Sequence, residues 1–246
     1  MTNRLFRTVL TLLTVLALWQ ALVTLAEIPR FILPGPLDVA EALWSNRAIL
    51  AENTAFSALN LAQGLALGLV LGIETALLLA LSDRARRALR PVLVFAQAVP
   101  VFALAPVLTL WLGFGALSKI VMVALVTYFP IASALFDGLM RLPQPLEDLA
   151  RQSGASRWRS LIYLRLPNAK PAFFSGLRLA VTYAPLAIII GEWVGASKGL
   201  GHLMLLANGR GQTPLMFASL IVLAIFSLAL WLAVDALARR EDRSLS

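Results

Sequence analysis

The chain has 246 residues, of which 59% are hydrophobic, 14% are charged and none is cysteine. The absence of cysteine excludes disulfide bonds and thiolate chemistry, and a mean hydropathy of +0.81 makes a bundle of membrane spans the first architecture to test. Lysine and arginine outnumber the acidic residues by 21 to 13, but they gather in loops as membrane topology requires, so this excess is no evidence for nucleic-acid binding.

Six segments are apolar enough, or nearly so, to be predicted as spanning helices. They cover residues 8–26, 54–81, 91–117, 120–136, 173–191 and 214–234. The first is predicted to be a retained anchor, because its uncharged run exceeds the usual signal-peptide core of roughly 7 to 15 residues.

Six spans place both termini on one face of the membrane, together with most arginine and lysine residues. The basic residues expected on the other face are Arg30, Arg47, Lys119, Lys198 and Arg210. By the positive-inside rule both termini are expected in the cytoplasm.

The stretch FILPGPLDVAEALWSN follows the first span on the outer face. Its residues Leu37, Ala40, Glu41, Leu43 and Trp44 have a mixed helical spacing, which favours a short helix lying at the membrane surface. A plain connecting loop is the alternative.

The second span carries Gly64, Gly68 and Gly72, each four residues from the next and therefore on one helix face. They predict close packing against another helix, either of the same chain or of a second copy. Glu74 lies roughly 120° around the helix from these glycines. A carboxylate at this depth is costly unless paired or protonated, so both an ion pair and a transport role stay open.

Prolines 100, 106 and 130 interrupt the third and fourth spans. Such bends are tolerated where neighbours or a cavity satisfy the backbone, and a path through the bundle would use them, although kinks without a transport role are common. Side chains within spans that can contact a small polar or heterocyclic solute are Gln97, Trp111, Tyr128 and Tyr183. Bundle packing or interfacial anchoring is the alternative for each.

Residues 137–170 form the longest polar interruption and begin with clear helix signals. Pro145 suits a first helical position, and Glu147 and Asp148 lie in the first turn, where the helix dipole favours anions. Gly154 suits the residue just past the end. These signals predict a helix of about nine residues.

A second helix is predicted to begin after Ser156, a good N-cap, and to finish before Pro167. Both helices are amphipathic and too short to be stable alone in water. Their apolar faces must therefore be held by the membrane surface, by the base of the bundle or by a docked protein.

This segment resembles the EAA loop of permease subunits of binding-protein-dependent bacterial ABC importers, the type I family. The family pattern is EAA, three residues, Gly, nine residues and then I-x-LP. Here it reads Asp148-Leu149-Ala150, three residues, Gly154, nine residues and Leu164-Arg165-Leu166-Pro167, with Asp for Glu, Leu for Ala and Leu for Ile. In that family the loop enters a cleft on the ATP-hydrolysing subunit. The resemblance implies ATPase coupling through Asp148, Ala150, Gly154, Leu164, Leu166 and Pro167.

Further stretches, including PVFALAPVLTLWLGFGALSKI and GEWVGASKGLGHLMLLA, resemble the branch that takes up nitrate, sulfonates, taurine and thiamine-precursor pyrimidines. The resemblance implies an all-α polytopic membrane bundle of six transmembrane helices with a cytoplasmic coupling-helix loop. Its parts are an anchor and outer-face segment (1–53), a permease core (54–236) with the EAA loop at 145–167, and a cytoplasmic tail (237–246).

The expected partners are two ABC ATPase subunits, an external or periplasmic substrate-binding protein, a second copy of the chain and membrane lipid, in the bacterial inner membrane. No nucleic acid, cofactor or metal is expected. The solute would be a sulfonate-, nitrate- or taurine-like anion or a thiamine-precursor pyrimidine.

Two rival functions remain. Gly195-Ala196-Ser197-Lys198-Gly199 matches the G-x-S-x-G elbow of serine hydrolases, with His202 near, but that elbow needs a strand before it and a helix after it. An ion-gradient carrier using Glu74 or Arg178 is the other, although we find no convincing internal repeat, which such carriers usually contain. The chain carries no GxxxxGK[ST] phosphate loop, so ATP-driven import would need a partner and the chain itself is not predicted to be an enzyme.

Overall fold

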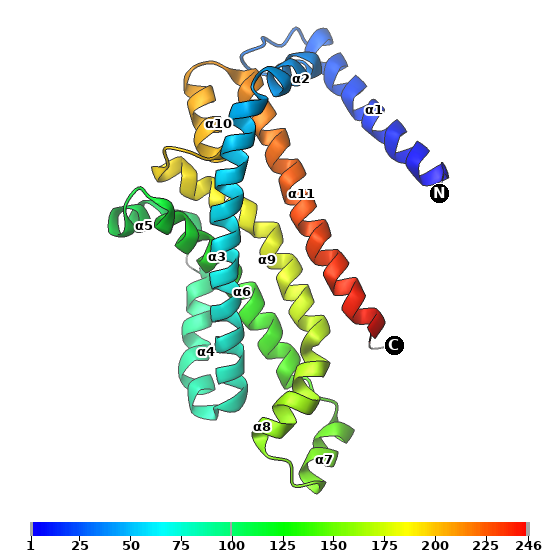
Figure 1. Cartoon of the computed structure of the whole chain (residues 1–246), viewed down its shortest axis with the longest axis vertical. Coiled ribbons are helices and arrows are strands. Elements are labelled where there is room, and N and C mark those ends of the chain that lie inside the picture. Colours follow the sequence, from blue (N-terminus) through cyan, green and yellow to red (C-terminus); the bar gives the residue numbers. More distant parts are fainter. Residues whose placement is uncertain (1, 99, 245–246) are drawn as a thin grey trace. The chain divides into compact units, whose positions relative to one another are not determined.

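The computed structural model describes residues 2–98 and 100–244, which form helices and turns without any strand (Figure 1). The chain divides into two units. The first unit contains Met1–Phe56 and Lys198–Ala224, and the second contains Ser57–Ser197 and Ile225–Ser246.

The first unit is built from α1 (Thr2–Leu25), α2 (Pro36–Ser45), α10 (Leu200–Gly209) and the N-terminal parts of α3 (Arg47–Leu81) and α11 (Thr213–Ser244). Helix α2 buries Val39 and Ala42 and exposes Leu37 and Trp44, so it is amphipathic. The guanidinium of Arg47 lies 4.9 Å from the centre of the Trp44 ring. The prediction of a helix here is confirmed, and its place at the membrane surface stays a prediction.

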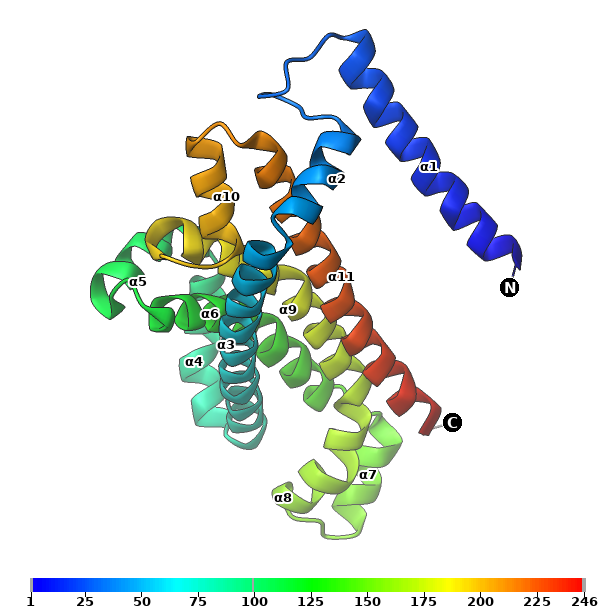
Figure 2. The same ribbon diagram turned by 45° about the horizontal axis from the view of Figure 1, so that its top comes forward.

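The second unit contains the remainder of α3 and α11 and all the elements from residue 83 to 195. These are α4 (Asp83–Ala98), the 3₁₀ turn Val101–Leu104, α5 (Ala105–Leu112), α6 (Ala116–Met140), α7 (Gln144–Gln152), α8 (Arg157–Ser160), the π-helical turn Leu161–Arg165 and α9 (Leu166–Gly195). Helices α7 and α8 lie together at one end of this unit in both views (Figures 1 and 2).

The glycine seam of α3 packs against α6 of the same chain. A Cβ atom placed on Gly64 would lie 2.5 Å from Cβ of Val123, and one placed on Gly68 would lie 2.9 Å from the carbonyl oxygen of Ala124. Only glycine lets the two backbones approach this closely. This settles the partner that the sequence left open.

Four described helical stretches are long and apolar enough to cross a membrane: Arg47–Leu81, Ala116–Met140, Arg157–Gly195 and Thr213–Arg240. Shorter apolar helices cover Leu10–Leu25 and Val101–Leu112. The prediction of a single spanning helix over residues 91–117 is wrong, because the helix is interrupted at Pro100 and again at Gly113, where a φ of +83° ends α5. Glycine adopts this conformation without steric strain.

Neither of the other two prolines ends a helix. Pro106 lies in the first turn of α5, where a missing N–H removes no intrahelical hydrogen bond, and α6 continues past Pro130.

Arg178, whose role the sequence left open, is ion-paired. Its Nε donates to Oδ1 of Asp235 on α11 at 2.9 Å, and Nε of Arg239 donates to Oδ2 of the same carboxylate at 2.6 Å. Asp235 is largely buried and therefore supplies the charge partner that a guanidinium within a span requires.

Candidate functional site

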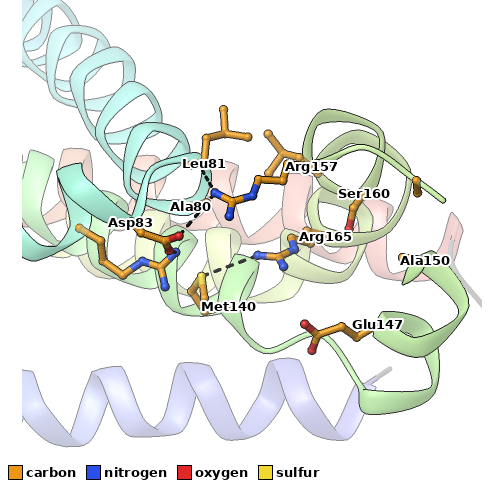
Figure 3. A pocket seen from close by; sticks show the side chains of 12 residues that line it. Ala80, Leu81, Asp83, Met140, Glu147, Ala150, Arg157, Ser160 and Arg165 are labelled. Carbon is orange, nitrogen blue, oxygen red and sulfur yellow. Dashed lines mark hydrogen bonds and ion pairs between the residues drawn. The ribbon is translucent and has the colours of Figure 1, made fainter. Parts of the chain in front are cut away.

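Helices α7 and α8 enclose a cavity of about 480 Å³ with the α3–α4 turn and the end of α6 (Figure 3). Its charged lining comes from Asp83, Arg86, Glu147, Arg157 and Arg165. The cavity therefore joins the predicted EAA loop to two of the helices long enough to span a membrane.

Helix α7 ends as the sequence predicts. Gly154 has φ of +64°, and the N–H of Ala155 donates to the carbonyl of Ala150 at 3.0 Å, which is the hydrogen bond of a glycine-terminated helix end. No atom lies within 4 Å of a Cβ placed on Gly154. Backbone conformation, rather than crowding within this chain, is what requires glycine here.

Helix α8 begins as predicted, because Oγ of Ser156 accepts a hydrogen bond from the N–H of Arg159 at 3.3 Å. The prediction that it finishes before Pro167 is wrong. A π-helical turn over Leu161–Arg165 leads directly into α9, and the N–H of Leu166 donates to the carbonyl five residues back, that of Leu161. This change of hydrogen-bond register precedes a proline that has no N–H to continue the usual ladder.

The six predicted coupling residues do not form one site. Asp148 and Gly154 are exposed, while Ala150 is buried and lines the charged cavity. Leu166 and Pro167 line a second, mostly apolar cavity of about 350 Å³ at the start of α9. Leu164, in the π-helical turn, is half-buried.

Three large apolar side chains of this segment are more than half exposed. The exposed fractions are 56% for Leu149, 57% for Trp158 and 73% for Tyr163. We call these three residues the apolar triplet. An amphipathic loop with such side chains uncovered has the composition of a docking surface.

The sequence alone does not single out Asp83, because one of its two partners, Arg157, lies on α8, far along the chain. Its carboxylate lies 3.0 Å from Nη2 of Arg86 and 3.4 Å from Nη1 of Arg157, which also donates to the carbonyl of Leu81 (Figure 3). Asn168 on α9 donates to the carbonyl of Arg141 at 3.0 Å. The loop is thereby tied to the end of α3 and the start of α4, and the residue after α6 is tied to α9.

The four predicted pathway residues are not brought together by any contact described. The hydroxyl of Tyr128 donates to Oγ1 of Thr75 at 3.1 Å and so belongs to the α3–α6 packing. Trp111 on α5 and Tyr183 on α9 are exposed, and the side chain of Gln97 lies outside the described residues. Glu74 is exposed on α3.

The G-x-S-x-G turn lies between α9 and α10, with no strand before it, so the setting of a hydrolase elbow is not met. Lys198 forms an ion pair with Glu52 at 2.8 Å; this hydrogen bond, and then the charge of Glu52, raise the pKa of Lys198. Glu192, near the end of α9, is fully buried. Its Oε1 accepts a hydrogen bond from Oγ of Ser57, which is far away in the chain.

Residues 64–246 match the model of a family described as the binding-protein-dependent transport system inner membrane component. The chain belongs to this family. A probable ABC transporter permease of Haemophilus influenzae is 45% identical to it over 96% of this chain and 97% of that protein. The predicted family is confirmed.

Other relatives of the permease carry solute names. The riboflavin transport permease RibX of Chloroflexus aurantiacus is 37% identical over 93% of this chain and 86% of its own length. The formylaminopyrimidine transport permease ThiX of Halalkalibacterium halodurans is 33% identical over 92% and 90%. The taurine permease TauC of Escherichia coli is 30% identical over 94% and 86%.

The permease also shares its fold with a solved transporter. An inward-facing structure of the MetNI methionine ABC transporter aligns with a TM-score of 0.71 at 19% identity, covering 80% of this chain and 98% of that one. The permease is therefore a multi-pass membrane subunit of an ABC importer for a small solute. The relatives named above are permease subunits, not enzymes.

Proposed function

We propose that the permease forms half of a solute pathway in the bacterial inner membrane and is driven by a separate ATPase subunit that docks on α7 and α8. The observation that carries this proposal is the exposed loop itself. It combines the left-handed Gly154, the apolar triplet and the EAA spacing in a chain that has no phosphate loop of its own.

The proposed topology has both termini in the cytoplasm and six crossings, of which the third is the broken path through α4 and α5. It is supported by the basic residues of the α3–α4 turn and of the α7–α8 loop, which share one predicted face. Residues 1–53 would form the anchor and outer-face segment, residues 54–236 the core and residues 237–246 the cytoplasmic tail.

In the proposed coupling, Asp148, Gly154 and the apolar triplet contact the ATPase, while Ala150 fixes α7 against the bundle. Movement of α8 then passes to the spans by two routes. One is continuous: Arg157–Gly195 is a single helical stretch of 39 residues that includes Leu164, Leu166 and Pro167. The other is the ion pair between Arg157 and Asp83, which lies at the start of α4, directly after the end of α3.

The proposed solute is a nitrogen heterocycle of the pyrimidine type. The names of the relatives at 37% and 33% identity refer to such ring systems, whereas the taurine permease is 30% identical. Aromatic side chains exposed on the permease, such as Tyr183, offer ring faces that suit a heterocycle.

Reconstitution in liposomes tests the function. Uptake is expected only when the ATPase, the substrate-binding protein and ATP are all supplied, and the solute that raises the melting temperature of the binding protein should be the one transported. Formylaminopyrimidine, riboflavin and taurine are the solutes to compare. Uptake by the permease alone under an ion gradient would instead identify a secondary carrier.

Asp83→Asn is expected to keep the permease folded and bound to its ATPase but to reduce uptake per ATP hydrolysed by more than half. Asp83 and Arg157 are both more than half exposed, so their ion pair contributes at most about 1 kcal/mol to stability. Arg157→Gln should act similarly, and the double variant should be no worse than either. Arg87→Gln, an exposed site on α4, is the matched control; equal uptake per ATP in Asp83→Asn and the control would contradict the transmission route.

A further inference from the structure

The start of α6 and the end of α9 lie at the end of the second unit opposite α7 and α8 (Figure 1), and a group of polar side chains is buried there. Lys119 on α6 is 1% exposed, Glu192 on α9 is 0% exposed and Ser57 on α3 is 1% exposed. Oγ of Ser57 donates to Oε1 of Glu192 at 2.7 Å, and the charge of Glu192 acts on the ammonium of Lys119. The proposed coupling uses none of these three residues.

The ammonium of Lys119 joins the ends of two helices. It donates to the carbonyl of Phe114, in the turn after α5, at 2.9 Å and to the carbonyl of Gly195, the last residue of α9. Its third contact is Oγ of Ser118 at 3.2 Å, and that hydroxyl in turn donates to the carbonyl of Gly113 at 2.9 Å. A cation is favourable at carbonyls that end helices, because those groups lack intrahelical partners.

The two helix ends that Lys119 joins are also in direct contact. A Cβ placed on Gly195 would lie 2.5 Å from Cγ2 and 3.0 Å from Oγ1 of Thr109 on α5. The end of α9 therefore has no room to shift toward α5. Phe114, whose ring is largely exposed, is held on the turn between them.

A buried charge contributes little net stability compared with apolar packing, because desolvation offsets much of the attraction to its partners. It does restrict geometry, since any arrangement that removes those partners leaves the buried charge unpaired. Three hydrogen bonds from one ammonium thus favour a single arrangement of α5, α6 and α9 at this end.

We propose that Lys119 is a positioning residue of the transport cycle. It clamps the α5–α6 turn to the end of α9, so that these helix ends move as one rigid body while the ATPase drives the opposite end. This inference rests on the proposed function, which supplies the cycle in which the clamp acts.

The chain contains no cysteine, so a cysteine pair can replace the clamp without competing thiols. Thr109→Cys with Gly195→Cys places two thiols at neighbouring positions on the two helix ends. Lys119→Met should lower uptake by more than half and lower the melting temperature by about 5 °C or more. Oxidation of the cysteine pair in the Lys119→Met background should restore uptake, and reduction should abolish it again. In the background with Lys119 intact, oxidation should leave uptake unchanged.

Thr109→Cys alone, which keeps Gly195 and so adds no Cβ at that close contact, serves as the control for oxidation. The double variant Lys119→Met/Glu192→Gln leaves no unpaired charge, so its melting temperature should be higher than that of Lys119→Met. It also supplies folded protein if Lys119→Met alone does not fold. In this double variant too, oxidation of the pair should raise uptake. The proposal is overturned if oxidation blocks uptake with Lys119 intact, because the helix ends would then have to separate, or if Lys119→Met matches the unsubstituted permease in uptake and melting.

Failure of the proposed function would look different. The unsubstituted permease would then show no ATP-dependent uptake of any solute, while the lower melting temperature of Lys119→Met and its recovery on oxidation would still report the clamp.

Discussion

Gly154→Asp is expected to leave the permease inserted and folded but to abolish both ATPase association and uptake. Nothing in the chain obstructs a side chain at this exposed position, and Asp is among the residues that tolerate a φ of +64°. The new carboxylate would stand on the same loop as the exposed Asp148. If this surface enters a cleft on the ATPase, the added charge is desolvated without a partner, which costs several kcal/mol. Pull-down of the ATPase and uptake in liposomes measure the two effects.

Two further substitutions separate charge from backbone strain. Gly154→Asn matches Asp in size and tolerates the same φ, so it should keep part of the association. Gly154→Val is neutral but β-branched, so it should instead destabilise the end of α7. The docking hypothesis fails if Gly154→Asp pulls down its ATPase and transports normally.

The parts of this loop that could be predicted from sequence depend on neighbouring residues alone. The side chain of Ser156 caps α8 by accepting a hydrogen bond from the N–H three residues later, and Gly154 ends α7 in a left-handed conformation. Such signals need no knowledge of the rest of the fold. The glycine spacing of α3 was equally informative about a packing face, although it did not identify α6 as the partner.

Two kinds of feature could not be predicted. One is a helix end or break for which the neighbouring residues indicate the wrong conformation. The other is a contact between residues that are distant in the chain. Pro167 indicated a helix end, but a π-helical turn lets the helix continue past it. Hydropathy joined α4 and α5 into one span, because an apolar average does not register the break at Pro100 between them or the turn at Gly113 after α5. The pairings of Asp83 and Glu192 required the folded arrangement of helices that are far apart in sequence.

Gly68→Leu is expected to prevent accumulation of the permease in the membrane, whether or not the ATPase is present. The added side chain would have to occupy space held by the backbone of α6, since even a Cβ at this position lies 2.9 Å from the carbonyl oxygen of Ala124. Backbone cannot rotate away as a flexible side chain can. Because α3 and α6 are both long enough to span the membrane, separating them would disrupt the centre of the bundle.

Substitutions by smaller side chains, or at other positions of α3, should reduce membrane abundance and melting temperature to a lesser extent. Gly68→Ala is expected to lower the free energy of unfolding by about 1–3 kcal/mol through overpacking. The higher helix propensity of alanine offsets roughly 1 kcal/mol of this loss. Gly72→Ala should cost less, because its nearest neighbour is Cγ2 of Ile131 at 3.0 Å, a side-chain atom. Ala66→Leu, exposed on α3 outside the seam, is the control for side-chain size and should accumulate normally. Membrane abundance and melting temperature in detergent measure the series. Equal abundance and melting of Gly68→Leu and Ala66→Leu would mean that α3 and α6 do not depend on this close approach, and the α3–α6 seam would then not be what holds the spans together.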